Sequence, residues 1–196
     1  MTISIGTCLS DGWADFKKDP ILHILATVLF GVVNGLTFGL LFGPLWVGHQ
    51  RTILKQRRGE SVSISDLFSG FENKTAIASI LGGILIPAIV GFGYLCCIIP
   101  GIILAPLMTL GLYPITLGSD DGIAAIRTGW QQISANMVGL AIATSMIGFV
   151  GMIGVLACGI GLFVTLPIAF GALVTLAQQA NDTTSPKLTD DVARQL

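Results

Sequence analysis

Two histidines are the residues whose chemistry could matter most in this chain. His23 and His49 flank a long uncharged stretch, and if that stretch folds back as a hairpin they lie at similar depth near its cytoplasmic ends. A pair of imidazoles can sense pH or supply half of a metal site. No Cys, Asp or Glu stands beside them, whereas a zinc site needs three or four ligands. We therefore expect ordinary histidines at the membrane interface and no metal site.

Three of the four cysteines fall where turns between membrane helices are expected. Cys96, Cys97 and Cys158 would lie on the outer, oxidising side of the membrane, where a disulfide from Cys158 to one of the adjacent pair is permitted. Free cysteines are also common small apolar residues in protein interiors. Both alternatives stay open. Cys8 belongs to the cytoplasmic side and is expected to be reduced.

Glycine is abundant, with 25 residues in 196, but no glycine run has the pattern of a nucleotide site. A phosphate loop needs a Lys followed by Ser or Thr, and the segment from Gly159 to Gly161 lacks the third glycine of a dinucleotide fingerprint. No paired acid and base accompanies these runs. We expect the glycines to allow close helix packing, and we assign no catalytic, cofactor-binding or metal residue. The sequence thus favours a protein that is not an enzyme and has no cofactor.

The elements that carry these residues must cross a membrane. The chain is 53% hydrophobic and only 11% charged, whereas soluble domains carry roughly 25% charged residues. Three stretches contain no charge at all: Pro20 to Gln50, Thr75 to Ser119, and Thr128 to Asn181. Each is longer than the ~20 residues that span a bilayer. The fold class is therefore an all-α, polytopic membrane protein, and the net charge of −1 gives no reason to expect a nucleic-acid partner.

A glycine followed by an aromatic residue recurs at nearly constant spacing. The dipeptides are Gly12-Trp13, Gly70-Phe71 and Gly129-Trp130. Each is followed by a long apolar stretch with a proline and then a glycine in its second half, namely Pro44 and Gly48, Pro106 and Gly111, and Pro167 and Gly171. This predicts one membrane domain over residues 1–180, built from three repeat units at about residues 9–58, 63–118 and 120–180.

Each unit is expected to begin with an amphipathic helix. In the second unit Ile64, Leu67, Phe68 and Phe71 follow the spacing of one helical face, and Ser63 with Asp66 forms a capping signal. The third unit repeats the pattern with Ile123, Ile126, Trp130 and Ile133. These segments should lie in the membrane interface, with Trp13, Phe71 and Trp130 among the headgroups.

The second and third uncharged stretches are long enough for two spans each. Proline and glycine in Ile99-Pro100-Gly101 predict the turn in the second stretch. We expect the third turn near Ala157-Cys158-Gly159. Prolines 87, 106, 114 and 167 lie inside the predicted spans, where they would kink the helices.

The first stretch has two interpretations. Gly31, Gly35, Gly39 and Gly43 would form a ridge on one long tilted helix over residues 20–50. Alternatively, the chain turns at Asn34-Gly35 and forms a short hairpin. The hairpin gives six spans and places all ten Lys and Arg residues on the cytoplasmic side, as the positive-inside rule prefers. The single helix gives five spans, and we favour six.

The six-span arrangement puts both termini in the cytoplasm. Residues 181–196 are polar and are expected to form a short cytoplasmic tail. The N-terminal residues lack the basic and apolar regions of a cleaved signal peptide.

Several segments carry a resemblance to known families. Arg57-Arg58-Gly59-Glu60, the run from Asp66 to Phe71, Ile99-Pro100-Gly101, and Gly159-Ile160-Gly161 with Pro167 resemble families of small bacterial multi-pass membrane proteins of unknown function. A looser similarity extends to the membrane portion that precedes the catalytic domain of some bacterial glycerophosphodiester phosphodiesterases. The resemblance covers about residues 10–180. It implies a location in the bacterial inner membrane and supplies no catalytic residues.

Two functions are compatible with so little chemistry. We favour a non-enzymatic scaffold or accessory subunit that lies in the lipid bilayer and packs against copies of itself or another membrane protein. The alternative is a carrier or channel for a neutral or lipidic substrate. The residues that could line its path are Asn34, Thr37, Thr109, Thr116, Asn136, Thr144, Ser145, Thr165 and Thr175.

Overall fold

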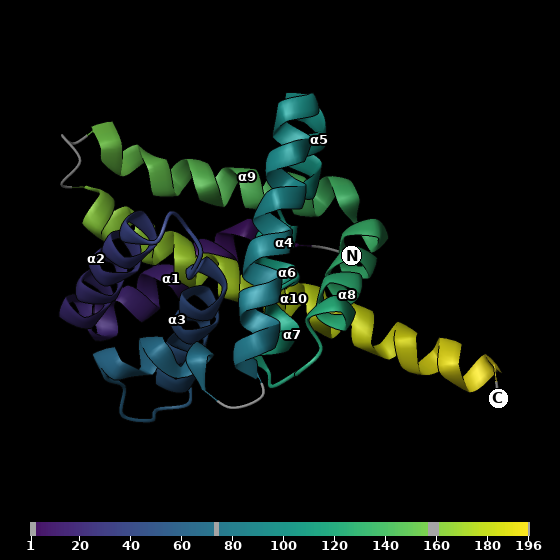
Figure 1. Cartoon of the computed structure of the whole chain (residues 1–196), viewed down its shortest axis with the longest axis horizontal. Helices are drawn as coiled ribbons and strands as arrows, with labels where there is room; N and C mark the ends of the chain where they lie inside the picture. The colour runs from purple at the N-terminus through teal and green to yellow at the C-terminus, as the bar shows by residue number, and fades with distance from the viewer. Residues whose placement is uncertain (1–2, 73–74, 157–160, 196) are drawn as a thin grey trace.

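The fold is all-helical, as the sequence predicts. The computed structural model describes residues 3–72, 75–156 and 161–195, without the side chains of residues 156 and 183–195. Every secondary-structure element in these ranges is a helix. Figure 1 shows the elements as three helical groups that follow one another along the chain.

The first group contains helices α1 (Ile5–Lys18), α2 (Pro20–Leu36) and α3 (Phe42–Arg57). Asp19 ends α1 and caps α2, since its carboxylate accepts a hydrogen bond from the backbone N–H of Leu22. The two helices meet at an angle of 104° there. Phe30 of α2 contacts Trp46 of α3, with ring centroids 6.0 Å apart, so α2 and α3 form an antiparallel pair.

The first uncharged stretch is therefore not one long helix. The chain turns at residues 37–41, slightly after the predicted Asn34-Gly35, and both of those residues belong to α2. Gly39 adopts a φ of 78° in this turn, which a residue without a Cβ adopts at little cost. Of the predicted glycine ridge, Gly31 and Gly35 face open space, whereas Gly43 packs against Gly83.

The second group begins with the short 3-10 helix η1 (Ile64–Phe71) and continues with α4 (Thr75–Cys96), α5 (Ile98–Leu104), α6 (Leu107–Leu110) and α7 (Tyr113–Thr116). The predicted capping box is present, because Ser63 and Asp66 bond reciprocally at the start of η1. The turn predicted at Ile99-Pro100-Gly101 lies a few residues earlier, at Cys97 between α4 and α5. Pro106 lies between α5 and α6, Pro114 lies in the first turn of α7, and Pro87 lies inside the continuous α4.

The third group contains α8 (Gly122–Ala135), α9 (Met137–Ile153), η2 (Gly154–Leu156) and α10 (Leu162–Gln195). The angle between α8 and α9 is 104°, the same as between α1 and α2. The predicted turn at Ala157-Cys158-Gly159 lies outside the described residues. Residues 181–195, predicted as a separate polar tail, continue α10 as helix.

Three helical segments are long and apolar enough to span a membrane: Thr75–Cys96, Ile98–Thr116 and Leu162–Asp182. The number rises to five if each bent pair, α1 with α2 and α8 with α9, counts as one span. This indicates a membrane protein. The predicted sixth span would be α3, which has only 16 residues and carries Arg51, Lys55 and Arg57 in its second half. Its length and charge explain why it does not qualify.

The groups are joined by contacts between each leading helix and a helix far away in sequence. In Figure 1, α1 lies along α10, η1 lies below α3, and α8 lies beside α7. The hairpin of α4 and α5 points in a different direction from that of α9 and α10. The core between the groups is apolar and includes Trp46, Leu110, Tyr113, Ile133 and Leu176, all at most 6% exposed.

The cysteines do not meet within the described part of the chain. Cys96 and Cys97 are exposed free thiols, and Cys8 is buried. Cys158, and with it the disulfide to Cys96 or Cys97 that the sequence permits, lies outside the described residues.

Candidate functional site

The most enclosed polar cluster is centred on Arg57, the last residue of α3. Its guanidinium donates two hydrogen bonds to Oδ2 of Asp15, at 2.9 Å from Nε and 2.6 Å from Nη2. It also donates to Oε1 of Gln178 at 2.7 Å, to Oγ1 of Thr175 at 2.8 Å and to the carbonyl oxygen of Gly171 at 3.1 Å. Asp15 is 4% exposed. The charges are thus paired and hydrogen-bonded, and the cluster fastens α1 and α10 to α3.

Glycine allows α1 to come close enough for this pairing. A Cβ on Gly12 would lie only 2.2 Å from the carbonyl oxygen of Ile168, and one on Gly171 would lie 2.7 Å from the Cα of Gly12. The two helix backbones are therefore in direct contact, one turn away from Asp15. Any side chain at Gly12 would push α1 off α10 and lengthen the bonds to Arg57.

A second cluster surrounds Arg51, nearly two turns earlier on α3. Its guanidinium donates to backbone carbonyls at three points, Thr116 at 3.1 Å, Ile115 at 3.0 Å and Ser69 at 2.7 Å. A fourth bond reaches Oγ1 of Thr75 at 3.3 Å. The carbonyls of Ile115 and Thr116 belong to the last turn of α7, where a cation is favourable. Arg51 therefore joins α3 to η1, α4 and α7 without a carboxylate among its hydrogen-bond acceptors.

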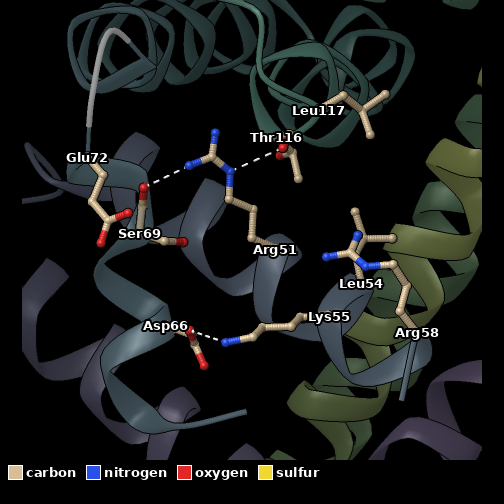
Figure 2. A pocket seen from close by; sticks show the side chains of 9 residues that line it. All are labelled: Arg51, Leu54, Lys55, Arg58, Asp66, Ser69, Glu72, Thr116 and Leu117. Atoms are coloured by element: carbon tan, nitrogen blue, oxygen red, sulfur yellow. Dashed lines mark hydrogen bonds and ion pairs between the residues drawn. The ribbon is translucent and has the colours of Figure 1, made fainter. Parts of the chain in front are cut away.

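A pocket of about 380 Å³ opens beside Arg51. Figure 2 shows its lining side chains, which come from α3, η1 and the end of α7: Arg51, Leu54, Lys55, Arg58, Asp66, Ser69, Glu72, Thr116 and Leu117. Arg51, Lys55 and Arg58 follow i, i+4 and i+7 spacing, which places all three on one face of α3. Arg57 lies on another face, which explains why the two clusters are separate.

Lys55 and Asp66 form an ion pair across the pocket, with 2.9 Å between Nζ and Oδ1. Burial by itself raises the pKa of Asp66, but the Lys55 ammonium and the Ser63 backbone N–H more than offset it, so this pKa is lowered. Arg58 is more exposed and donates from Nε to Glu60. Among the described residues, its Nη atoms and the Glu72 carboxylate have no hydrogen-bond partner.

Both histidines are buried inside the protein. His23 is 2% exposed, and its Nε2 forms a hydrogen bond of 2.8 Å with Oε1 of Gln56. His49 is 3% exposed and packs between Phe30 and Phe170. The partners of these rings are an amide and aromatic rings, and no group of three metal-ligating side chains occurs within the described ranges.

Most of the polar residues considered as a carrier lining form hydrogen bonds within the protein. Several hydroxyls and amides bond to a nearby backbone carbonyl one turn earlier on their own helix, as Asn34, Thr37 and Thr116 do. Asn136 caps α9, Thr165 bonds to the carbonyl of Gly151, and Thr175 joins the Arg57 cluster. These side chains therefore stabilise helix ends and helix pairs. Of the others, Thr109 is buried, Thr144 has a buried hydroxyl without a partner, and Ser145 faces outward.

Two apolar pockets lie on the outer faces of the hairpins. One, of about 480 Å³, lies over α4 and α5 and is lined by Leu85, Ala88, Ile89, Phe92, Gly93, Cys96, Pro100 and Leu104. The other, of about 370 Å³, lies between α5 and α9 and is lined by Ile102, Ile103, Met137, Val138, Ala141, Ile142, Ser145 and Met146. Such surfaces suit lipid chains or apolar helices, and they carry no charged group.

The sequence predicted Arg51, Lys55, Arg57 and Arg58 as cations on the cytoplasmic side and did not predict either arginine cluster. The i, i+4, i+7 spacing of three of them was the available signal for a cationic helix face. The pairing of Arg57 with Asp15 had no such signal, because 42 residues separate them.

No protein-family model, curated protein or solved structure matches this chain. The resemblance to small bacterial membrane-protein families therefore stays a prediction, and the proposed function is based on the residues and their geometry.

Proposed function

We propose that the chain is a non-enzymatic scaffold or accessory subunit of a membrane, which works by packing its apolar helices against copies of itself or another membrane protein. The observation that carries this proposal is where polar and apolar side chains lie. The enclosed Arg57 cluster and most of Arg51's donors are used in bonds between helices. The outer faces of α2, α4 and α9 are apolar, with exposed residues such as Ile21, Ile77 and Phe149.

The helix packing favours a scaffold over a carrier or channel. Helices α3, α6, α7 and α10 contact one another in the middle of the molecule. Trp46, Leu110, Tyr113 and Leu176 fill this region and are nearly or fully buried. A permeation path along this axis would require these side chains to move apart, at the cost of the packing that holds the three groups together.

Three similar units explain the long-range glycine contacts. Gly12 of the first group packs on the Pro167–Gly171 segment, Gly70 of the second on Pro44, and Gly129 of the third on Gly111. Each leading helix thus packs on the proline- and glycine-containing helix of another unit, and the three contacts close a ring. This supports the repeat units at residues 9–58, 63–118 and 120–180.

We further propose six spans in a bacterial inner membrane, with both termini in the cytoplasm. The antiparallel pair of α2 and α3 would complete three hairpins, and α3 decides the topology because it qualifies neither alone nor as part of a bent pair. The cationic second half of α3 suits the cytoplasmic side. Reporter fusions at residues 38 and 60 test this: opposite sides support six spans, and the same side contradicts them.

The scaffold proposal is tested by measuring assembly and transport on the same purified preparation. We expect the full-length, affinity-tagged protein in mild detergent to run as a defined homo-oligomer or complex. The Gly31→Leu variant adds bulk where the chain itself leaves open space, so it should keep its helicity and lose assembly if α2 is a contact face. Ile142→Asn on α9 tests the other exposed face in the same way.

The control is Gly6→Leu, which also adds a side chain into open space but lies on α1. It should assemble normally. A monodisperse monomer together with robust solute flux or lipid scrambling in liposomes would contradict the scaffold and support the carrier.

A further inference from the structure

The pocket beside Arg51 lies where apolar helices end. Its wall residue Glu72 is three positions before the start of α4, and Leu117 directly follows the apolar segment Ile98–Thr116. Leu117 is 59% exposed, and Leu54 adds a second apolar side chain to an otherwise polar lining. A pocket that combines charged and apolar walls at the end of membrane helices is placed at the level of lipid headgroups.

The pocket offers cationic donors for a phosphate. The four bonds of Arg51 go to neutral oxygens and leave one of the two N–H groups on Nη1 unused. Arg58, seven residues later on the same face, keeps its Nη donors open within the described region. Arginine is well suited to phosphate oxygens because its donors form a planar fork.

Among the described residues, the pocket also offers one carboxylate without a direct ion pair. Lys55 forms an ion pair with Asp66, so these two charges compensate each other. Glu72 also lines the pocket, and its charge acts on Arg51 without a direct ion pair. A free phosphate or an anionic headgroup would bind near the arginines but face repulsion from Glu72.

We propose that this pocket binds the headgroup of a zwitterionic phospholipid that carries a primary ammonium, of the phosphoethanolamine type. The phosphodiester lies against Arg51 and Arg58, the ammonium donates to Glu72, and the glycerol region contacts Leu54 and Leu117. A choline headgroup has the same charges but no N–H to donate, so Glu72 distinguishes the two. The inference does not depend on the scaffold role, since a subunit or a carrier could hold such a lipid.

The test uses delipidated full-length protein in detergent with short-chain lipids as probes, and native mass spectrometry counts bound lipid. We expect the phosphatidylethanolamine to bind about tenfold more tightly than the phosphatidylcholine or phosphatidylglycerol of the same chain length, as expected for one charge-assisted hydrogen bond. Inorganic phosphate and glycerophosphoethanolamine, which lacks acyl chains, distinguish a lipid site from a soluble phosphate site.

Two variants identify the site, and neither removes a hydrogen bond of Arg51 or Arg57 that joins helices. Glu72→Gln should abolish the preference for the ethanolamine lipid, and Arg58→Gln should weaken binding of all the phospholipids. Arg127→Gln removes an exposed cation on α8 and serves as the matched control. Circular dichroism confirms that each variant is folded. Equal binding of all lipids to the wild type, equal competition by inorganic phosphate, or unchanged selectivity in Glu72→Gln would each overturn the proposal.

Discussion

Arg51 and Arg57 lie on the same helix, within two turns of each other, yet their surroundings assign them different tasks. Arg57 meets a buried carboxylate, an amide and a hydroxyl, and its side chain is only 18% exposed. Arg51 meets backbone carbonyls and borders an open pocket. The comparison shows that two arginines on one helix can be held differently, one in an ion pair that joins helices and the other by neutral carbonyl oxygens without a direct ion pair.

The largest loss of stability is expected when the ion pair of Arg57 with Asp15 is broken. Asp15→Asn leaves the Arg57 guanidinium in an enclosed site without a counter-charge, and loss of one partner of a buried pair typically costs about 3–5 kcal/mol. The unfolding midpoint in mixed micelles should fall accordingly. If the midpoint were unchanged, water would have to reach Arg57, and the contrast with Arg51 would disappear.

A somewhat smaller loss of stability is expected from Gly12→Ala. The new Cβ would meet the backbone of α10 at Ile168, and backbone cannot move aside as a flexible side chain can, so we expect about 1–3 kcal/mol from overpacking. Gly31→Ala is the matched control, because it places the same methyl group in open space. That control should be neutral or slightly stabilising, since alanine favours helix over glycine. Equal stabilities for the two variants would contradict the close contact.

Arg51→Lys should cost less than the loss of Asp15, at about 1–2 kcal/mol. An ammonium cannot reach the carbonyls of Ser69, Ile115 and Thr116 at once as the planar guanidinium does, but the positive charge remains. The same stability assay measures this, and Arg127→Lys on the exposed face of α8 is the control. A loss as large as that of Asp15→Asn would mean that Arg51 is as essential to packing as Arg57.

The smallest effect should come from the pair of Lys55 and Asp66, which is only partly buried. Because the pKa of Asp66 is lowered in the folded protein, its stabilisation is present above the unfolded pKa of about 3.9 and is lost as pH falls through the folded value. Wild type should therefore exceed Asp66→Asn in stability at pH 6, by less than about 1 kcal/mol. The difference should shrink as pH falls below about 3.9. A difference that grew on acidification would contradict the direction of the shift.

Composition and local spacing were sufficient to predict the fold class. The uncharged stretches predicted apolar helices, Ser63 with Asp66 predicted the start of η1, and proline with glycine predicted the turn after α4 to within a few residues. These features depend on residues close together in the chain. The sixth span stays a prediction, because α3 combines an apolar first half with a cationic second half.

The candidate site could not be predicted in the same way. Arg57 bonds to Gln178, 121 residues away, and nothing in the local pattern of either segment specifies that pairing. The burial of His23 and His49 also depends on residues distant in sequence, since Gln56 bonds to the first ring and Phe170 packs on the second. Arg51 was still harder to recognise, since backbone carbonyls have no residue type that a sequence could reveal.

The choice of acceptors around Arg51 has a consequence for sequence variation. Every residue supplies the same backbone carbonyl oxygen, whatever its side chain. The residues at positions 69, 115 and 116 can therefore change while the bonds to Arg51 persist. The Arg57 cluster depends on the side chains of Asp15, Thr175 and Gln178. In diverging relatives, we therefore expect position 51 to stay arginine among variable neighbours, and position 57 to change only together with position 15.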